Sequence, residues 1–300
     1  MESAAEVAAD IKMRASHAGV TEVWLHARAL DGGPELSIRG TEPVVTASVF
    51  KVPVAVELAR QAAESDLDLA ELVTVRPGEG PPSPYGLAAF RHETTLSWDA
   101  LATLMISVSD NVATDLVLAE VGKDAVNALL ARLGLPGTAV THSCAELLAT
   151  IGEDLGIPYE DDERVLSGLT VRELGRLSAL DPARTCRTTP EEATRLLAMI
   201  WHDTAAPARA CADVRRWLGG QVWPHRLRSG FVGDDVRVSG KTGTLPTIRN
   251  EVGVVEYESA GYAVAVFTRA EDARSQVPAR DAFIGFAGAR AVGWLRARTS

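Results

Sequence analysis

The 300 residues of the chain, 46% hydrophobic and 23% charged, suffice for a globular protein with one large domain or two smaller units that share a core. The formal net charge of −10 argues against a nucleic-acid partner, because phosphate binding needs a basic surface. No run approaches the roughly 18 unbroken apolar residues of a membrane span, so we expect no membrane partner either.

The first segment predicts an amphipathic helix, with Ala4, Val7, Ile11 and Ala15 near 3.6-residue spacing. Acidic residues stand where a secretory signal has a basic start and an apolar run. We therefore expect a cytoplasmic protein, or a secreted one if a signal has been removed from the sequence. Segments 22–30 and 35–38 follow as two strands of a hairpin, joined by a Gly-Gly-Pro turn.

A long helical block begins near Ser48, where an apolar stripe extends a helix to about residue 64. Thr189 is a typical N-cap, because proline follows it and acidic residues fill the next positions. Helical spacing predicts further helices at 97–108, 111–120, 123–133 and 189–201. Strands return at 236–239, 251–258 and 262–268, and a last amphipathic helix covers about 279–298.

This order of elements predicts an α/β (α+β) fold in a single domain. Strands from both chain ends would build one antiparallel sheet, flanked by the terminal helices, into which an all-helical lobe is inserted. We expect an α/β lobe at approximately 1–47 plus 215–300 and a helical lobe at approximately 48–214. An active site is expected in the cleft between the lobes.

Ser48 and Lys51 form an SxxK motif at the start of a predicted helix. Residues three apart share a helix face, so the amine can approach the hydroxyl. A serine is a weak nucleophile until a base takes its proton, and lysine is such a base only when its pKa falls. The helix N-terminus also suits a developing oxyanion. SxxK alone also arises by chance, so its context decides.

Two more motifs follow along the chain. Ser109 and Asn111 belong to an SDN tripeptide, in which the hydroxyl could relay a proton and the amide could bind a substrate carbonyl. A plain helix cap is the alternative interpretation of these residues. The KTG motif at Lys241, Thr242 and Gly243 follows a predicted strand and continues with Thr244. A cation, hydroxyls and a glycine suit a substrate carboxylate and a close backbone approach.

The ordered SxxK, SDN and KTG set resembles class A β-lactamases and penicillin-binding proteins, over most of the chain. The spacing from Ser48 to Ser109 is close to that of class A enzymes. The resemblance implies an acylated Ser48, with Lys51 in proton transfer and Ser109 and Lys241 delivering a proton to the leaving nitrogen. It further implies an oxyanion hole from backbone N–H groups and substrate contacts from the remaining motif residues, namely Asn111, Thr242, Gly243, Thr244 and Arg249. A surface salt bridge is the alternative for Arg249.

The chain departs from that family where class A enzymes carry the glutamate that activates water for deacylation. Cys144 stands at the matching position, Glu146 stands two residues later, and Thr150 replaces the asparagine that closes the loop motif. An extra helical piece at about 152–180 would rebuild the mouth of the cleft. Glu146 remains a candidate deacylation base, with a surface position as the alternative, so deacylation is expected to be slow or altered.

Three cysteines are present, and an odd, sparse count is typical of reduced thiols. No CxxC pair and no His/Cys cluster has zinc-ligand spacing, so we expect neither a metal nor a cofactor. Cys144 and Cys186 flank the inserted region, where relatives hold the loop neck with a salt bridge. Whether these two pair is left open.

The sequence therefore predicts a β-lactamase-like serine hydrolase that forms an acyl-enzyme at Ser48. Its substrate would be a β-lactam or a related small amide or ester, which connects it with antibiotic resistance. Two alternatives remain: a cytosolic esterase or peptidase of the same superfamily, and a binding protein that retains the fold without the chemistry. The oligomeric state is left open.

Overall fold

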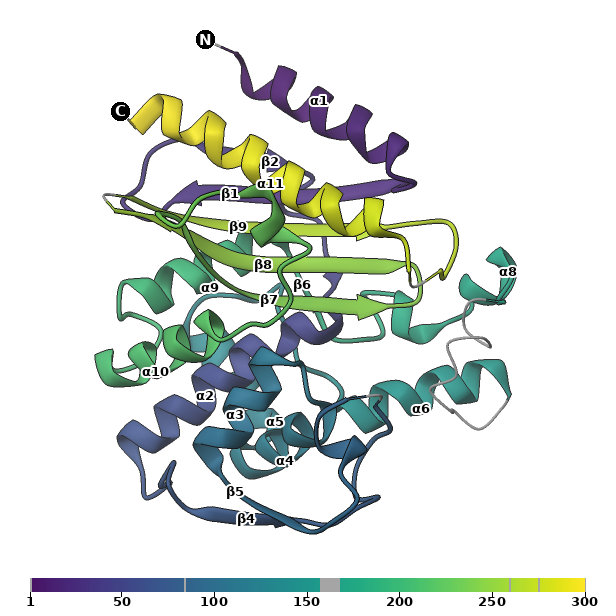
Figure 1. Cartoon of the computed structure of the whole chain (residues 1–300), viewed down its shortest axis with the longest axis vertical. Coiled ribbons are helices and arrows are strands. Elements are labelled where there is room, and N and C mark those ends of the chain that lie inside the picture. Colours follow the sequence, from purple (N-terminus) through teal and green to yellow (C-terminus); the bar gives the residue numbers. More distant parts are fainter. Residues whose placement is uncertain (1, 84, 157–167, 259, 275, 300) are drawn as a thin grey trace.

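A five-stranded antiparallel sheet is the centre of the computed structural model, which describes residues 2–83, 85–156, 168–258, 260–274 and 276–299 (Figure 1). The strands come from both ends of the chain, which confirms the predicted fold class. In spatial order they are β2 (Glu35–Ile38), β1 (Glu22–Ala29), β9 (Ala260–Arg269), β8 (Ile248–Tyr257) and β7 (Arg237–Leu245). Strand β7 therefore forms one edge of the sheet.

Both faces of the sheet are covered, which explains why the centre of β9, at 263–267, is apolar without interruption. Alternate β9 residues enter different cores: Val264 and Val266 face one, whereas Ala265 and Phe267 face the other. The terminal helices α1 (Ala4–His17) and α11 (Pro278–Thr299) pack together above the first face (Figure 1). Helix α9 (Pro190–Trp201) packs on the second face.

The inserted lobe lies below the second face and is mostly helical. It is not all-helical, however, because β4 (Leu72–Val75) and β5 (Thr94–Ser97) form a two-stranded ribbon that the sequence analysis missed. A second small ladder joins β3 (Val44–Val45) to β6 (Arg187–Thr188). The helices are α2 (Lys51–Glu64), α3 (Trp98–Ser107), α4 (Asn111–Val121), α5 (Lys123–Arg132), α6 (Cys144–Leu155), α8 (Val171–Leu174) and α10 (Ala208–Gly219).

Two boundaries differ from the prediction near the expected site. Helix α10 was not predicted, and it crosses the expected lobe boundary at residue 214. Strand β7 extends six residues past 239, so the KTG motif lies within the strand, where β8 pairs with it residue by residue. Backbone pairing sustains β7 although most of its residues are polar or glycine.

The expected extra piece at 152–180 is described only in part, because 157–167 lie outside the described residues. Its described parts are the end of α6, the short helix α8 and a 3₁₀ turn at Ser178–Leu180. None of the helices in the described part of the chain combines the length and the apolar character that a membrane crossing requires.

Candidate functional site

Ser48 lies in a 3₁₀ turn, Ala47–Phe50, which leads directly into α2 at Lys51. The preceding Ala47 has φ of +46°, a left-handed conformation that costs a non-glycine residue free energy. Such strain tends to gather at functional sites. Ser48 is half-buried, whereas Lys51 at the start of α2 is fully buried. The turn thus joins a half-buried serine to a buried lysine.

The Lys51 amine is held by the SDN motif. Its Nζ donates to the Ser109 carbonyl oxygen at 2.8 Å and to Asn111 Oδ1 at 2.8 Å, and it lies 3.3 Å from Ser109 Oγ. These contacts join α2 to the loop between α3 and α4. The structure therefore brings the first two motifs together, 58 and 60 residues apart in the chain.

The Lys241 amine reaches the same hydroxyl from the sheet. Its Nζ lies 2.9 Å from Ser109 Oγ and donates to the Thr242 carbonyl oxygen at 2.9 Å. Ser109 Oγ is thus shared by two lysine amines, one from α2 and the other from β7. The residue itself is strained, with φ of +64°. One hydroxyl therefore connects all three motifs.

The electrostatics of this cluster favour loss of a proton from the lysines. Burial lowers the pKa of Lys51, because a desolvated ammonium is costly. The pKa of Lys241 lies well below its ordinary value, first through burial and then through the charges of Lys51 and Arg226. When one of these two amines is neutral it is a base, and the other, as an ammonium, is a proton donor, so the pair can move a proton through Ser109.

Asp110, the middle residue of the SDN motif, has a structural role. It is fully buried, and its carboxylate accepts the Ala113 N–H at 3.0 Å and the Leu87 N–H at 2.7 Å. The first contact caps α4, as the alternative interpretation of this motif requires. The cap places Asn111 in the first turn of α4 and leaves its amide for Lys51.

Gly243 lets β7 lie directly against the Ser48 turn. A Cβ on this glycine would stand 2.5 Å from the Thr46 carbonyl oxygen and 3.2 Å from the Ala47 Cβ. Asn250 on β8 ties the same turn to the sheet, because its Nδ2 donates to the Val45 carbonyl oxygen at 2.9 Å. The close approach explains a glycine at this position of the strand.

The substitution Gly243→Ala is expected to destabilise the protein by about 1–3 kcal/mol, since the strand or the Ser48 turn must shift. The free energy of unfolding in urea measures this loss. Gly293→Ala is the matched control, because a Cβ there has open space and alanine favours a helix interior. Equal stability of the two variants would contradict the close approach.

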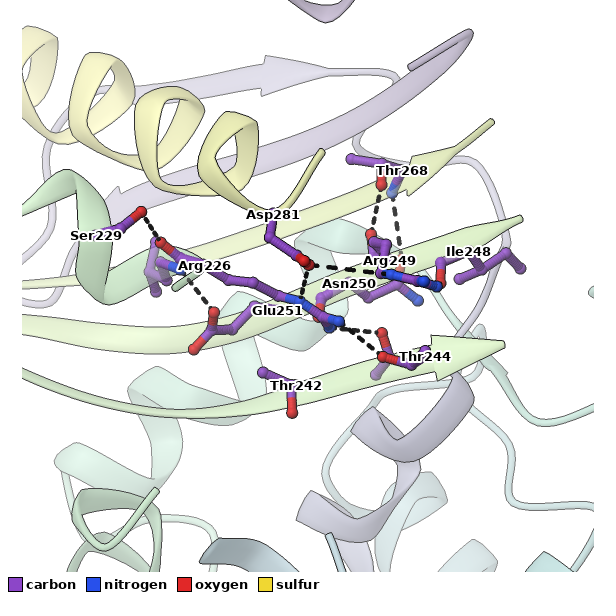
Figure 2. A network of polar contacts seen from close by, with 12 residues as sticks. Arg226, Ser229, Thr242, Thr244, Ile248, Arg249, Asn250, Glu251, Thr268 and Asp281 are labelled. Carbon is purple, nitrogen blue, oxygen red and sulfur yellow. Dashed lines mark hydrogen bonds and ion pairs between the residues drawn. The ribbon is translucent and has the colours of Figure 1, made fainter. Parts of the chain in front are cut away.

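An arginine that the sequence analysis missed holds the end of the KTG strand (Figure 2). Arg226 is 5% exposed; it donates to the Gly243 carbonyl oxygen at 3.0 Å and to Thr244 Oγ1 at 2.8 Å. Asp281 pairs with it at 2.6 Å. By contrast, Arg249 donates to the Ile248 carbonyl oxygen at 3.0 Å and lies 4.0 Å from Asp281. The guanidinium that contacts the Thr244 hydroxyl is therefore that of Arg226, while Arg249 lies opposite Thr244 in the pairing of β7 with β8.

The carboxylate of Glu146 is turned away from the lysines. It accepts from Lys123 Nζ at 2.6 Å and from the Ser143 N–H at 2.7 Å, which completes a capping box at the start of α6. Its side chain is 52% exposed. The structure therefore does not bring Glu146 together with Lys51 and Lys241, and it places this residue at the surface.

Cys144 is the first residue of α6, and its side chain influences the pKa of Lys51. The charge of each influences the pKa of the other, and burial raises the pKa of the Cys144 thiol to about 12. Asp115 fixes the start of α6, because its carboxylate accepts the N–H groups of Cys144 and Ala145 at 2.6 and 2.8 Å. At neutral pH the thiol is therefore protonated, at the position where class A enzymes carry the deacylating glutamate.

All three cysteines are buried free thiols, so Cys144 and Cys186 do not pair in this structure. Among the described residues, no three His, Cys, Asp or Glu side chains are grouped as metal ligands.

Comparison with known proteins matches residues 5–295 to the model of the β-lactamase enzyme family. A β-lactamase regulatory protein, BlaB of Streptomyces cacaoi, is 32% identical over 280 residues, which cover 87% of this chain and 86% of that protein. The β-lactamase from Sphaerobacter thermophilus superposes with a TM-score of 0.78 at 23% identity and covers 99% of both chains. An acyl-enzyme complex of a PBP-A variant with penicillin G has a TM-score of 0.74 at 18% identity, with 97% of both chains covered.

Proposed function

Since the chain belongs to the β-lactamase enzyme family, we propose that it is a serine hydrolase in which Ser48 attacks an amide or ester carbonyl and forms an acyl-enzyme. The observation that carries this proposal is the convergence of the Lys51 and Lys241 amines on the Ser109 hydroxyl, with Lys51 at the end of the turn that contains Ser48. Packing alone does not require two buried amines and a strained serine in one place.

In the proposed reaction, neutral Lys51 accepts the Ser48 proton as Oγ attacks the carbonyl carbon. The oxyanion is stabilised by backbone N–H groups of Ser48 and Thr244. The bond to the leaving nitrogen then breaks, and that nitrogen takes a proton from Ser109, which Lys241 replenishes. Water later releases the acyl group from Ser48.

A β-lactam is the substrate class that we propose first, because it presents a strained amide and a carboxylate. The carboxylate would be bound by the Thr242 and Thr244 hydroxyls and by the Arg226 guanidinium that contacts Thr244. Names of similar proteins support the same class, since they include β-lactamases and a penicillin G complex. A small ester or peptide amide is the remaining option.

Intact-protein mass spectrometry during incubation with penicillin G tests this proposal. We expect a mass increase of one penicillin per chain and, after digestion, an adduct on the peptide that contains Ser48. A parallel screen of p-nitrophenyl esters and D-amino-acid amides tests the other acyl donors. If none of these acyl donors modifies the protein, the proposed acyl-enzyme chemistry is wrong, and a binding protein that retains the fold is the better interpretation.

A regulatory role is the second candidate function, and Cys144 favours it. A buried thiol with a pKa of about 12 does not activate water at neutral pH, so the adduct on Ser48 would persist. A persistent acyl-enzyme reports the presence of a β-lactam rather than removing it, and the similar BlaB protein is named as a regulatory protein. An adduct that lasts for hours supports this role, whereas loss of the adduct within seconds supports a β-lactamase.

A further inference from the structure

Glu251 is a buried carboxyl that the proposed reaction does not use. It lies on β8 directly opposite Thr242 of the KTG motif and is fully inaccessible to solvent (Figure 2). Burial raises its pKa to about 7, while Arg226 and Lys241 oppose that shift. A Cβ on Gly240 would stand 3.3 Å from its Oε1, so a glycine leaves room for this carboxylate behind the strand. Burying an ionisable carboxyl costs free energy of folding, and its contacts show what it stabilises.

The two carboxylate oxygens of Glu251 accept hydrogen bonds from the two ends of the segment 221–227. Oε1 accepts from Gln221 Nε2 at 2.7 Å, and Oε2 accepts the Leu227 N–H at 2.6 Å. The Leu227 contact also fixes the neighbouring Arg226, which binds Gly243 and Thr244. One carboxylate thus holds the segment 221–227 against the KTG strand at both of its ends.

Glu251 also determines which way the Gln221 amide faces. Above the Glu251 pKa of about 7 the carboxylate is ionised and only accepts hydrogen bonds, so the Gln221 NH₂ group must point toward it. The amide oxygen is then left for the Thr242 N–H, which donates to it at 3.0 Å. With the amide reversed, an NH₂ group would face the Thr242 N–H, and two donors would oppose each other.

The Thr242 N–H lies on the free edge of the sheet. It is bound by Gln221 and not by β8, and β7 is the outermost strand. N–H groups two residues apart in a strand point to the same edge, so the Thr244 N–H points to the free edge as well. Thr244 is exposed, whereas Thr242 is 6% exposed. Of these two edge positions, Gln221 covers the first and leaves the second open.

We propose that Glu251 is a positioning residue that, through Gln221, closes the Thr242 position of the β7 edge and so confines substrate pairing to Thr244. The proposal rests on the acyl-enzyme function above, because it concerns how the substrate carbonyl is placed beside Ser48. Pairing at Thr242 would displace the substrate by two residues along the strand, about 7 Å, and away from the nucleophile.

Two variants break this arrangement differently. Gln221→Met keeps the side-chain length but removes the acceptor for the Thr242 N–H. Glu251→Gln keeps the shape of the carboxyl but no longer fixes the Gln221 amide. Glu57→Gln is the matched control, because Glu57 is also fully buried and accepts from a glutamine, Gln61, within α2.

Backbone amide hydrogen exchange, measured by NMR in the free protein, tests the positioning without any reaction. We expect the Thr242 N–H to exchange about tenfold faster in Gln221→Met and Glu251→Gln than in the wild type, and to be unchanged in Glu57→Gln. Unchanged exchange in Gln221→Met overturns the proposal, and this variant decides the matter if Glu251→Gln does not fold.

Acylation kinetics with a fluorescent penicillin test the choice of register. Pairing at an opened Thr242 is non-productive, so the substrate dissociation constant and the limiting acylation rate should fall together, by about fivefold each, in Gln221→Met. Their ratio should stay within twofold of the wild type, whereas general distortion of the site would lower that ratio. A lowered ratio overturns the register argument. If the wild type is never acylated, the acyl-enzyme proposal fails, while the exchange measurement still decides the role of Glu251.

Discussion

Replacing Lys51 with methionine is expected to slow acylation of Ser48 by a factor on the order of 10³, because the proposed reaction loses its general base. Methionine nearly fills the space of the lysine stem, so the fully buried position remains packed. Stopped-flow fluorescence with a labelled penicillin measures the rate. Lys123→Met is the control, because Lys123 is a partly exposed lysine that pairs with Glu146.

The pH profile of the same reaction distinguishes a base from a packing residue. Burial lowers the pKa of Lys51, and only the neutral amine accepts a proton, so the wild-type rate should rise with pH and level off once Lys51 is neutral. This limb should disappear in Lys51→Met. The contribution of Lys51 to stability, measured as the difference between the wild type and Lys51→Met, should also rise with pH between the lowered pKa of Lys51 and its ordinary value, because the unfolded chain binds the Lys51 proton more tightly than the folded one. A rate within tenfold of the wild type would contradict the role of Lys51.

Much of the fold was predictable, because its largest elements carry their signals locally. The periodicity around Val7 and Ile11 and the caps at Ser97 and Thr189 identify helices from a few residues each. Helix α10 also carries its signal locally, as an amphipathic pattern through Ala210, Val214 and Trp217, so this helix too was predictable from the sequence.

The end of β7 could not be predicted from the sequence, for a physical reason. Lys241 and Gly243 have low strand propensity, and only pairing with β8 makes them part of a sheet. The sequence of a single segment does not reveal its pairing partner, so the predicted strand ends before the motif. The ribbon of β4 and β5 was missed for a related reason, since its strands are four residues long and exposed in part.

The candidate site was predictable where the motif residues themselves make the contacts. Ser109 meets both lysines as the motif order suggested. Arg226 was missed because no short pattern marks it, and its contact with Thr244 arises from the packing of the segment before β7 against the strand edge. The surface position of Glu146 follows from a local capping box, which the sequence Ser143 to Glu146 could have indicated.

Introducing a carboxylate at the start of α6 is expected to turn a persistent acyl-enzyme into one that turns over. In Cys144→Glu, the new side chain would replace a thiol whose charge interacts with Lys51, beside the site of acylation. The two carboxylates that act on Lys51 in the wild type, Asp110 and Asp115, each accept two backbone N–H groups instead of activating water. A general base contributes about 10²–10⁴-fold, so we expect the adduct lifetime to shorten by at least about 100-fold.

Time-resolved mass spectrometry of the penicillin adduct measures that lifetime. Cys144→Gln is the matched control, because it has the same size and polarity as the glutamate variant but lacks its basicity. The helix N-terminus and Lys51 favour a negative charge at residue 144, whereas Asp115 opposes it, so thermal unfolding of both variants must accompany the kinetics. A folded Cys144→Glu variant whose adduct persists as long as that of Cys144→Gln would show that the thiol is not what limits deacylation. A short-lived adduct in the wild type would contradict the same argument from the other side, because the protein would then possess a base that the start of α6 does not supply.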